Sequence, residues 1–366
     1  MKKKIYVTQP FLPPLNEYIK YLEEIWDCGI LTHNGPLVQK LEKELIKRLQ
    51  VNNLIATSNA TMALQLAIKA LNLKGEIITT PFTYIATIAA INWEKCTPIF
   101  VDIDEETFNI DSTKIEEKIT KKTSAILGVH TFSNPCNIEA IEKIAKDNKL
   151  KVIYDSAHGM FVNYKNKSLL EYGDISIVSF HATKLFNTVE GGACITESDI
   201  LAEKIKSYRF FGFNEKKDIV THGTNAKMTE VHAAMGLATL KYMDEVRKSR
   251  REKYELYKKL LSSNENVKFQ KINEESHNYS YMPVLFKSEN ILKQVLKILN
   301  DNNIFPRRYF YPSLNKVKVI STYEDNLEKA EDIATRILCL PLYNKLKTED
   351  IEIICYLINQ IAYRDS

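Results

Sequence analysis

The sequence predicts an α/β fold in which a larger domain, built on a mostly parallel mixed sheet flanked by helices, precedes a smaller α+β domain. Two observations carry this prediction. Through the first two thirds of the 366 residues, short apolar runs alternate with segments of helical periodicity, as in βαβ units. After about residue 235 the pattern changes to a long charged helix and fewer strands. We therefore expect a larger domain at 1–235 and a smaller one at 236–366.

The elements of the larger domain follow from the spacing of apolar residues. Short apolar runs indicate buried strands, and apolar positions three and four apart indicate amphipathic helices. The sequence predicts strands at 76–80, 98–101, 124–129, 151–154, 175–180 and 193–196, and helices at 61–72, 83–93 and 137–148.

The elements of the smaller domain are mainly helical. The expected order is a charged helix at 228–262, a strand-like stretch at 279–286, a helix at 288–301, an extended segment at 305–312 and helices at 325–337 and 348–363. Because no linker poor in apolar residues separates the two parts, we expect them to pack together.

Composition restricts the class of function. The net charge of +4, from 50 basic and 46 acidic residues, suits an enzyme for anionic metabolites but is too small to indicate nucleic-acid binding. The six cysteines are far apart and form no CxxC pair, which argues against a disulfide framework and against a zinc site. No apolar run reaches membrane-spanning length. We expect a soluble cytosolic protein without a metal.

Polar residues gather at three places next to predicted elements, and the ligands of α/β sheets bind at the carboxyl ends of the strands. Thr57 to Thr61 stand immediately before a helix, where they can cap it or offer its free N–H groups to a phosphate. Asp155 and His158 close a strand, and each alone could be structural. Lys184 follows another strand, where burial would lower its pKa, and Gly191-Gly192 lets backbone turn closely nearby. A single lysine is more often solvated and inert.

Together the three segments narrow the chemistry. They supply a phosphate cradle, an acid and an amine at neighbouring strand ends, which is the set that pyridoxal 5′-phosphate requires. The sequence has no G-x-G-x-x-G after its first strand, and no P-loop, GxSxG or HExxH motif. Nicotinamide dehydrogenases, P-loop nucleotidases, serine hydrolases of that type and zinc proteases are therefore poorly supported.

At these residues the chain resembles the DegT/DnrJ/StrS family of sugar aminotransferases, which are fold-type I pyridoxal phosphate enzymes. The likeness extends over nearly the whole chain, and the lysine segment is highly specific. It includes VTQPFLPPL (7–15), LTHNGP (31–36), TPFTYIAT (80–87), FVDID (100–104), YDSAH (154–158), SFHATKLFNTVEGGA (179–193), GTNAKMTEVHAAMG (223–236) and RRYFYPSLN (307–315).

The resemblance implies a role for each matching residue. Lys184 would bond the cofactor covalently and then move the substrate proton, and Asp155 would pair with the ring nitrogen. Tyr84 would stack on the ring, and His158 would lie near its O3′ edge. The phosphate would be held by Ala60, Thr61 and Ser179, with Asn59 lining the turn and Asn225 contributed by the neighbouring subunit. The family's active sites lie at a homodimer interface, so a monomer should be inactive.

Within the family, the motifs look most like enzymes that aminate dTDP-4-keto-6-deoxyglucose at C4 for surface polysaccharides such as capsule or O-antigen. L-Glutamate is the donor that the resemblance implies. Substrate contacts would come from His181, Arg307, Arg308, Tyr309 and Tyr311, although the two arginines could instead form a solvated edge and His181 could equally only brace its loop.

The chain also departs from the family pattern. Where relatives commonly carry His-Val-Tyr-Gly-Asn-Pro, this sequence has HTFSNP (130–135), and Ser58-Asn59-Ala60 stands where many have Ser-Gly-Thr. These changes keep open a small phosphorylated ketone such as dihydroxyacetone phosphate, or amination at C3 of a dTDP-3-keto-6-deoxyhexose.

Two other classes of function are compatible with the same fold. A sugar dehydratase on the same fold would have histidine at the position of Lys184, and a regulator or scaffold without turnover would be expected to have lost Lys184, Asp155 or Thr61. The chain keeps all three residues, which favours the aminotransferase.

Overall fold

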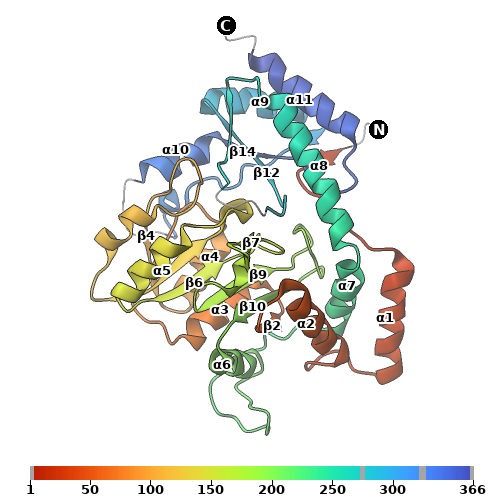
Figure 1. Cartoon of the computed structure of the whole chain (residues 1–366), viewed down its shortest axis with the longest axis vertical. Coiled ribbons are helices and arrows are strands. Elements are labelled where there is room, and N and C mark those ends of the chain that lie inside the picture. Colours follow the sequence, from red (N-terminus) through yellow and green to blue (C-terminus); the bar gives the residue numbers. More distant parts are fainter. Residues whose placement is uncertain (1–3, 273–276, 321–326, 363–366) are drawn as a thin grey trace.

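The computed structural model describes residues 4–272, 277–320 and 327–362 (Figure 1). Its centre is a seven-stranded sheet in the order β2-β10-β9-β6-β5-β3-β4. The strands are β2 (Asn53–Thr57), β3 (Glu76–Thr79), β4 (Thr97–Phe100), β5 (Thr123–Val129), β6 (Lys151–Asp155), β9 (Ile175–Ser179) and β10 (Gly192–Thr196).

The sheet is mixed, as predicted. Strands β9, β6, β5, β3 and β4 run parallel, whereas β10 is antiparallel to both of its neighbours, β9 and β2. Consecutive residues face opposite sides: Ile77 packs in one apolar cluster and Ile78 in another. Both faces are therefore buried, which explains why these strands appear in the sequence as continuous apolar runs.

Helices cover both faces of this sheet. α3 (Ala60–Ala70) packs on β9 and β10 and against α4 (Ile85–Trp93) and α6 (Asp199–Arg209), while α5 (Ile138–Asp147) packs on β5 and β6. At one side, α1 (Leu15–Cys28) and α2 (Pro36–Leu49) pack on α7 (Glu230–Leu240) (Figure 1). The described residues also form a two-stranded ribbon, β7 (Asn163–Tyr164) with β8 (Lys167–Ser168). They contain five 3-10 helices, at Ser112–Lys114, Glu116–Lys118, Thr131–Ser133, Leu169–Glu171 and Leu314–Lys316.

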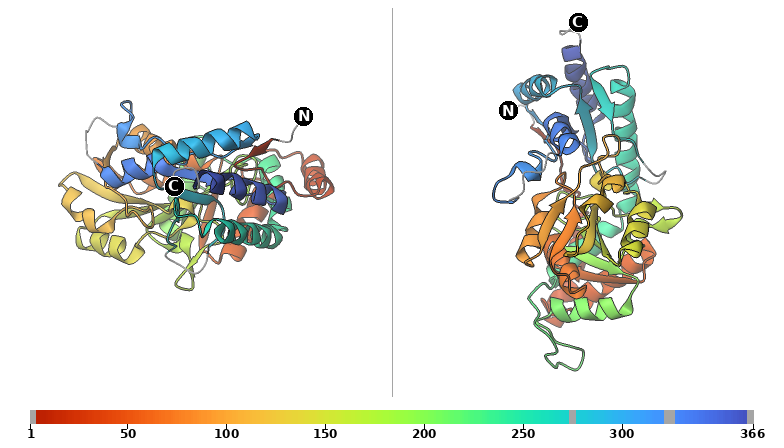
Figure 2. Two further views of the ribbon diagram at one scale, coloured as in Figure 1. Left: turned by 90° about the horizontal axis from the view of Figure 1, so that it is seen from above. Right: turned by 90° about the vertical axis from the view of Figure 1, so that its left-hand side faces the viewer.

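The C-terminal part lies above this layer in Figure 1 and in the right-hand view of Figure 2. Its antiparallel sheet has the order β11 (Val267–Phe269), β12 (Met282–Phe286) and β14 (Ile337–Leu340). The surrounding helices are α8 (Met243–Leu261), α9 (Glu289–Asp301), α10 (Glu328–Arg336) and α11 (Thr348–Ala362).

The chain's first strand lies with this C-terminal part. β1 (Ile5–Tyr6) pairs in parallel with β13 (Ile304–Phe305), and Ile5 belongs to the apolar cluster that otherwise consists of residues from α8 onward. The division at residue 235 stays a prediction. None of the helices in the described ranges combines the length and the apolar character needed to cross a membrane.

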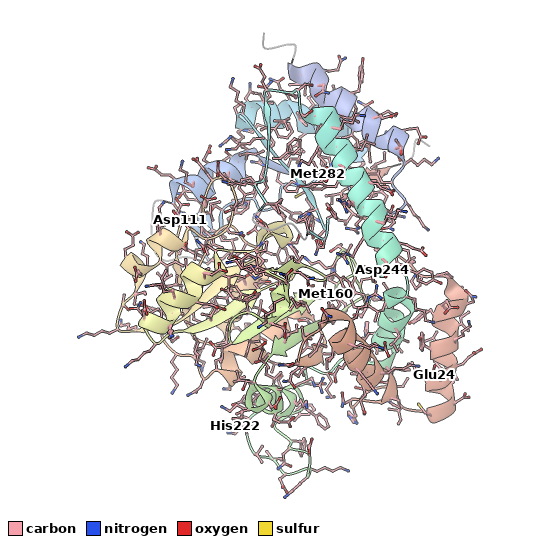
Figure 3. All side chains as sticks on the ribbon, viewed as in Figure 1. Glu24, Asp111, Met160, His222, Asp244 and Met282 are labelled. Atoms are coloured by element: carbon pink, nitrogen blue, oxygen red, sulfur yellow. The ribbon has the colours of Figure 1, made fainter. Side chains whose placement is uncertain are left out.

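The predicted elements of the larger domain agree with the structure to within three residues at each end, whereas the smaller domain differs more. The single helix expected at 228–262 is wrong: it is divided into α7 and α8 at Lys241-Tyr242. The turn separates two helices with different surroundings. α7 is buried on almost all sides, against α1 and α2, whereas α8 buries one stripe, which starts in the same apolar cluster as α7 and ends in the cluster of the C-terminal part. Figure 3 labels Asp244 just after this division.

Other differences lie near the C-terminus. Strand β14 directly follows α10, where the sequence predicted only a helix, and residues 325 and 326 of that predicted helix lie outside the described residues. Of the extended segment at 305–312, only Phe305 belongs to a strand. Strands β2 and β11 and helices α1, α2 and α6 were not predicted.

Candidate active site

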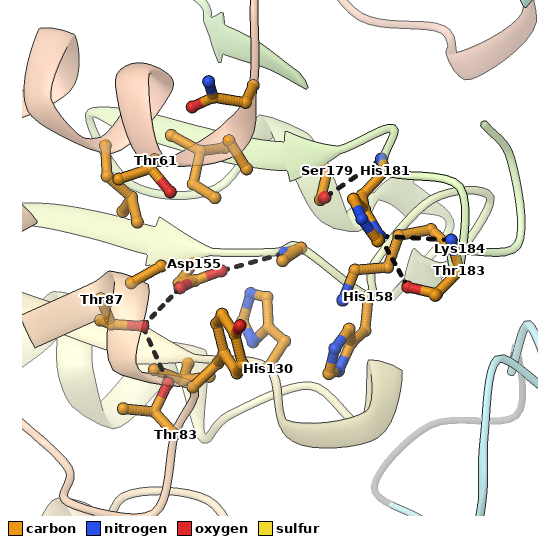
Figure 4. Close-up of a pocket in the computed structure, with 18 of the residues that line it drawn as sticks. Thr61, Thr83, Thr87, His130, Asp155, His158, Ser179, His181, Thr183 and Lys184 are labelled. Atoms are coloured by element: carbon orange, nitrogen blue, oxygen red, sulfur yellow. Dashed lines mark hydrogen bonds between the residues drawn. The ribbon is translucent and has the colours of Figure 1, made fainter. Parts of the chain in front are cut away.

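A cavity of about 280 Å³ opens where several strands of the large sheet end (Figure 4). Its walls come from the segments that the sequence singled out and from the C-terminal part of the chain. Eleven of the fourteen predicted site residues line it: Asn59, Ala60, Thr61, Tyr84, Asp155, His158, Ser179, His181, Lys184, Arg307 and Tyr309.

The first wall is the N-terminus of helix α3. Asn59 caps this helix, because its side-chain oxygen accepts a hydrogen bond of 2.8 Å from the backbone N–H of Met62. The amides of Ala60 and Thr61 are in the first turn, where a helix offers them no acceptor. They line the cavity together with Ser179, which ends β9. This wall therefore presents N–H groups and the positive end of a helix dipole, as an anion requires.

Glycine is required for this wall to form. A Cβ on Gly192 would lie 2.6 Å from the backbone nitrogen of Ala60 and 2.7 Å from the carbonyl carbon of Asn59. The start of β10 therefore passes directly against the start of α3, at a distance that only glycine allows.

Asp155 lies at the end of β6 and is 7% exposed. Its Oδ2 accepts a hydrogen bond of 2.8 Å from the Thr87 hydroxyl, and its Oδ1 accepts one of 3.1 Å from the backbone N–H of Ala157. Burial raises the pKa of Asp155, while these two bonds and the ammonium of Lys184 oppose the rise. A carboxylate has about four lone-pair sites, so Asp155 keeps capacity for a further cationic or N–H partner.

Lys184 follows β9 in the loop 180–191, and its amine lies near the Tyr281 hydroxyl, 3.4 Å away. Burial lowers the pKa of this amine to about 8, and the nearby Asp155 carboxylate partly offsets the decrease. Lys184 can therefore change its protonation state close to neutral pH, which ordinary lysines cannot do.

Aromatic rings close the cavity on the side of the C-terminal part. The His158 ring stacks on Phe132 and lies 4.7 Å from the ring of Tyr281, between ring centroids. The Phe310 ring is nearly parallel to both, 5.7 Å from Phe132 and 6.3 Å from His158 between centroids. Burial lowers the pKa of His158 well below its ordinary value, so this imidazole is neutral at physiological pH.

The remaining lining residues are at the rim. Tyr84 precedes α4 and is 59% exposed. The exposed His181 lies in the loop of Lys184, where its Nδ1 is 2.8 Å from the Thr183 hydroxyl. The Arg307 guanidinium lies 5.4 Å from the centroid of the Tyr309 ring. One cation and several rings are thus available to a ligand that extends out of the cavity.

Three predicted site residues are not brought into the cavity of their own chain. Arg308 lies 3.4 Å from the centroid of the Tyr311 ring and donates to the carbonyl of Thr335 at 2.8 Å, so both side chains belong to a contact outside the lining. Asn225 is exposed and pairs through its backbone with Phe210.

Asn225 stands at the base of the segment 211–224, which projects beyond α6 (Figure 1). Figure 3 labels His222 on this segment. Phe211, Ile219 and Val220 on it are large apolar side chains that are 47%, 73% and 59% exposed. A projecting segment with this composition is typical of a surface that contacts another protein.

The sequence reasoning missed several residues of the cavity. Thr83 and Thr87 have hydroxyl oxygens 2.8 Å apart, and their spacing of four residues could have placed them on one helical face. His130 directly follows β5, a position that the strand-end argument covers. Phe310 lies inside the segment 307–315 that the sequence analysis quoted, between two of its predicted site residues, whereas Tyr281 is far from the other site segments and no local pattern indicates it.

These residues fit pyridoxal 5′-phosphate. The helix N-terminus suits a phosphate, Asp155 has spare capacity for the protonated ring nitrogen, and the partly buried amine of Lys184 can bond an aldehyde. Among the described residues, no group of three His, Cys, Asp or Glu side chains could hold a metal ion.

Comparisons with known proteins agree with this choice of cofactor. Residues 15–359 match the DegT/DnrJ/EryC1/StrS aminotransferase family. The chain is 42% identical to the dTDP-4-amino-4,6-dideoxy-D-glucose transaminase of Shigella dysenteriae, over 99% of this chain and all of that one.

Solved structures are also similar. DesI, solved in the presence of its TDP-sugar product, has a TM-score of 0.95 and 30% identity, covering all of this chain and 94% of its own. NtdA from Bacillus subtilis, solved with bound cofactor PMP, has a TM-score of 0.89 and 27% identity, covering all of this chain and 87% of its own. The chain therefore belongs to the DegT/DnrJ/EryC1/StrS family and is an aminotransferase that depends on pyridoxal phosphate.

Proposed function

We propose that Lys184 is the amine that bonds the cofactor, that Asp155 holds its ring nitrogen, and that the first turn of α3 with Ser179 binds its phosphate. Tyr84 would cover one face of the ring, and His158 would lie at its edge. The observation that carries this proposal is that three groups line the same cavity: a helix N-terminus, a buried carboxylate and an amine with a pKa of about 8.

When bound, pyridoxal phosphate acts as an electron sink for the carbon that loses its proton. The residues of the chain supply the rest. The Nζ of Lys184, neutral above its pKa of about 8, takes the proton from the amino donor and delivers it in the second half of the reaction. Thr87 and the Ala157 amide orient the Asp155 carboxylate and favour its ionised form. The rings of Phe132, Phe310 and Tyr281 exclude water from that side.

For the acceptor we propose dTDP-4-keto-6-deoxy-D-glucose, which becomes the 4-amino-4,6-dideoxy sugar. The name of the relative at 42% identity and the TDP-sugar product of DesI support this choice. At the rim, Arg307 can pair with a pyrophosphate, and Tyr309 offers a ring for stacking. His181 lines the cavity from the loop that carries Lys184. No contact in the cavity favours a small phosphorylated ketone or a 3-keto sugar over this acceptor.

We further propose a homodimer with shared sites, in which Asn225 of one subunit completes the phosphate cradle of the other. The exposed position of Asn225, directly after the projecting segment 211–224, supports this arrangement. L-Glutamate is the proposed donor, and surface polysaccharide such as capsule or O-antigen is the proposed destination of the product. All six cysteines are free thiols, which supports the reducing cytoplasm as the compartment.

A half-reaction spectrum tests the substrate. The protein is converted to its pyridoxamine form with L-glutamate and then offered a panel of ketones, while the absorbance of the lysine-bound cofactor is followed. Return of this band with a dTDP-4-keto-6-deoxyhexose alone is the expected result. Return only with a small phosphorylated ketone would contradict the proposed acceptor but leave the assignment of Lys184 intact.

A further inference from the structure

The amine of Lys184 has a neighbour outside the motifs of the large domain. Its Nζ donates to the hydroxyl of Tyr281 at 3.4 Å and lies 5.7 Å from the centroid of that ring. The two distances place the amine at the hydroxyl end of the tyrosine and not over its face. The contact is long for a hydrogen bond, and the four-carbon stem of the lysine allows it to shorten.

The Tyr281 ring is held in place by three other rings. It packs against His158 at 4.7 Å, Phe132 at 5.8 Å and Tyr309 at 5.8 Å between centroids. These neighbours come from three different segments of the chain, so the direction of the hydroxyl is fixed by packing on several sides. A group oriented in this way is preorganised for its partner.

The backbone before Tyr281 is fixed as well. The buried Arg250 donates to the carbonyl of Ser280 at 3.0 Å, and the amide of Asn278 donates to the carbonyl of Met160 at 2.8 Å. Asn278 also donates to the carbonyl of His158. The segment that carries Tyr281 is thus tied to the segment that carries His158, although 118 residues separate Asn278 from Met160.

The phenol suits a partner that changes its charge. Tyr281 is 4% exposed, and burial raises its pKa far above the physiological range, so its hydroxyl stays neutral. A neutral hydroxyl can accept a hydrogen bond from an ammonium and can donate one to a neutral amine. It can therefore hold Lys184 in both protonation states. No other side chain in the described residues hydrogen-bonds the Nζ of Lys184.

We propose that Tyr281 is a positioning residue: its hydroxyl holds the amine of Lys184 against the reacting carbon whenever that amine is not bonded to the cofactor. This inference rests on the proposed role of Lys184. Without the hydroxyl, the flexible lysine would sample more conformations, and fewer of them would be in reach of the proton that it transfers.

Other titratable groups also act on this pair. Those that affect Lys184 or Tyr281 from the neighbouring elements are Tyr84, Asp155, His158, Arg250, Arg307 and Cys339. The substitution Tyr281→Phe leaves all of them in place, since it removes one oxygen from a ring that packing already holds.

The first test measures the rate at which apoprotein bonds pyridoxal phosphate, as a function of pH. The hydroxyl stabilises the ammonium more than the amine, because hydrogen bonds from charged donors are stronger. Tyr281→Phe should therefore lower the pH midpoint by about half a unit. The rate constant of the half-reaction with L-glutamate should also fall by roughly fivefold to tenfold, the value of one ordinary hydrogen bond.

Tyr257→Phe is the matched control. Tyr257 is also buried, and its hydroxyl donates a hydrogen bond of 2.9 Å to the carbonyl of Pro341, away from the cavity. This variant should lose stability while keeping the wild-type pH midpoint and half-reaction rate. If Tyr281→Phe behaves like this control, Tyr281 only packs and the proposal is wrong.

Two further measurements separate the possible outcomes. Borohydride reduction and peptide mapping locate the bonded cofactor: label on a residue other than Lys184 overturns the proposed function, whereas label on Lys184 with an unshifted midpoint overturns only the role of Tyr281. Should Tyr281→Phe fail to fold, 4-fluorophenylalanine at position 281 keeps nearly the same shape but has no hydroxyl to bond the amine. It should also lower the midpoint, and an unchanged midpoint would overturn the proposal.

Discussion

The hydroxyl of Thr87 lies 2.8 Å from the Oδ2 of Asp155 and connects the first turn of α4 to the end of β6 (Figure 4). Burial raises the pKa of this carboxyl group, and the Thr87 hydrogen bond is the largest of the effects that lower it again. A threonine of α4 therefore sets how easily the proposed partner of the ring nitrogen keeps its negative charge.

Thr87→Val should reduce activity most strongly at low pH. Valine has the same shape but no hydroxyl, so the pKa of Asp155 would rise further and less of the carboxylate would be ionised on the acid side. We expect the acid limb of the kcat/KM profile to move to higher pH. Thr79→Val is the matched control, because the buried Thr79 hydroxyl has no partner among the described residues. A profile unchanged in both variants would argue against this role of Thr87.

Asp155→Asn should decrease turnover by roughly 10²–10³-fold, since it removes the charge opposite the ring nitrogen at nearly constant shape. Steady-state kinetics check this, together with thermal unfolding. Asp102→Asn serves as control: Asp102 is also buried and accepts hydrogen bonds from the amides of Lys329 and Ala330 at the start of α10, far from the cavity. It should lower the melting temperature and leave kcat near wild type. Near-normal turnover in Asp155→Asn would remove the carboxylate from the proposal.

The rate at which apoprotein bonds pyridoxal phosphate should rise with pH around a midpoint near 8. Only the neutral amine attacks the carbonyl, and burial lowers the pKa of Lys184 to about 8, so the neutral fraction grows as the pH rises through this value. Stopped-flow absorbance measures the midpoint. A range of about four pH units, from ~6 to ~10, is wide enough to include the whole titration. A midpoint near 10.4, the ordinary value for lysine, would contradict the burial argument.

Local pattern was sufficient for most elements of the large domain and for singling out residues that line one cavity, whose chemical roles stay proposals. Buried parallel strands are continuous apolar runs, and the residues directly after them, Asp155 and Lys184, could be found by position alone. Contacts between distant segments could not. Tyr281 reaches Lys184 across 97 residues, and the division between α7 and α8 depends on the different neighbours of the two helices, α1 and α2 for α7 and α11 for α8. The pairing of Arg308 with Tyr311, away from the cavity, is likewise a tertiary effect.

Gly192→Ala should weaken retention of the cofactor. The added Cβ would lie 2.6 Å from the backbone nitrogen of Ala60, so the first turn of α3 would have to move and its N–H groups would no longer converge on the phosphate. The measurement is the dissociation constant of pyridoxal phosphate, obtained by spectral titration of apoprotein. In the control Gly29→Ala, the glycine has a φ of +67° and no neighbour within 4 Å of the added Cβ. That variant should lose stability but bind the cofactor normally.

Mixing two inactive variants should restore activity if the sites are shared. Lys184→Ala removes the amine of one site, and Asn225→Asp puts a negative charge where the partner's phosphate is proposed to bind. In a mixed two-fold dimer, both changes fall on one site and the other site is intact, so random exchange should recover about a quarter of wild-type activity. As controls, each variant goes through the same exchange procedure without the other variant. Absence of recovery, with subunit exchange verified by mass spectrometry, would mean that Asn225 acts within its own chain or not at all.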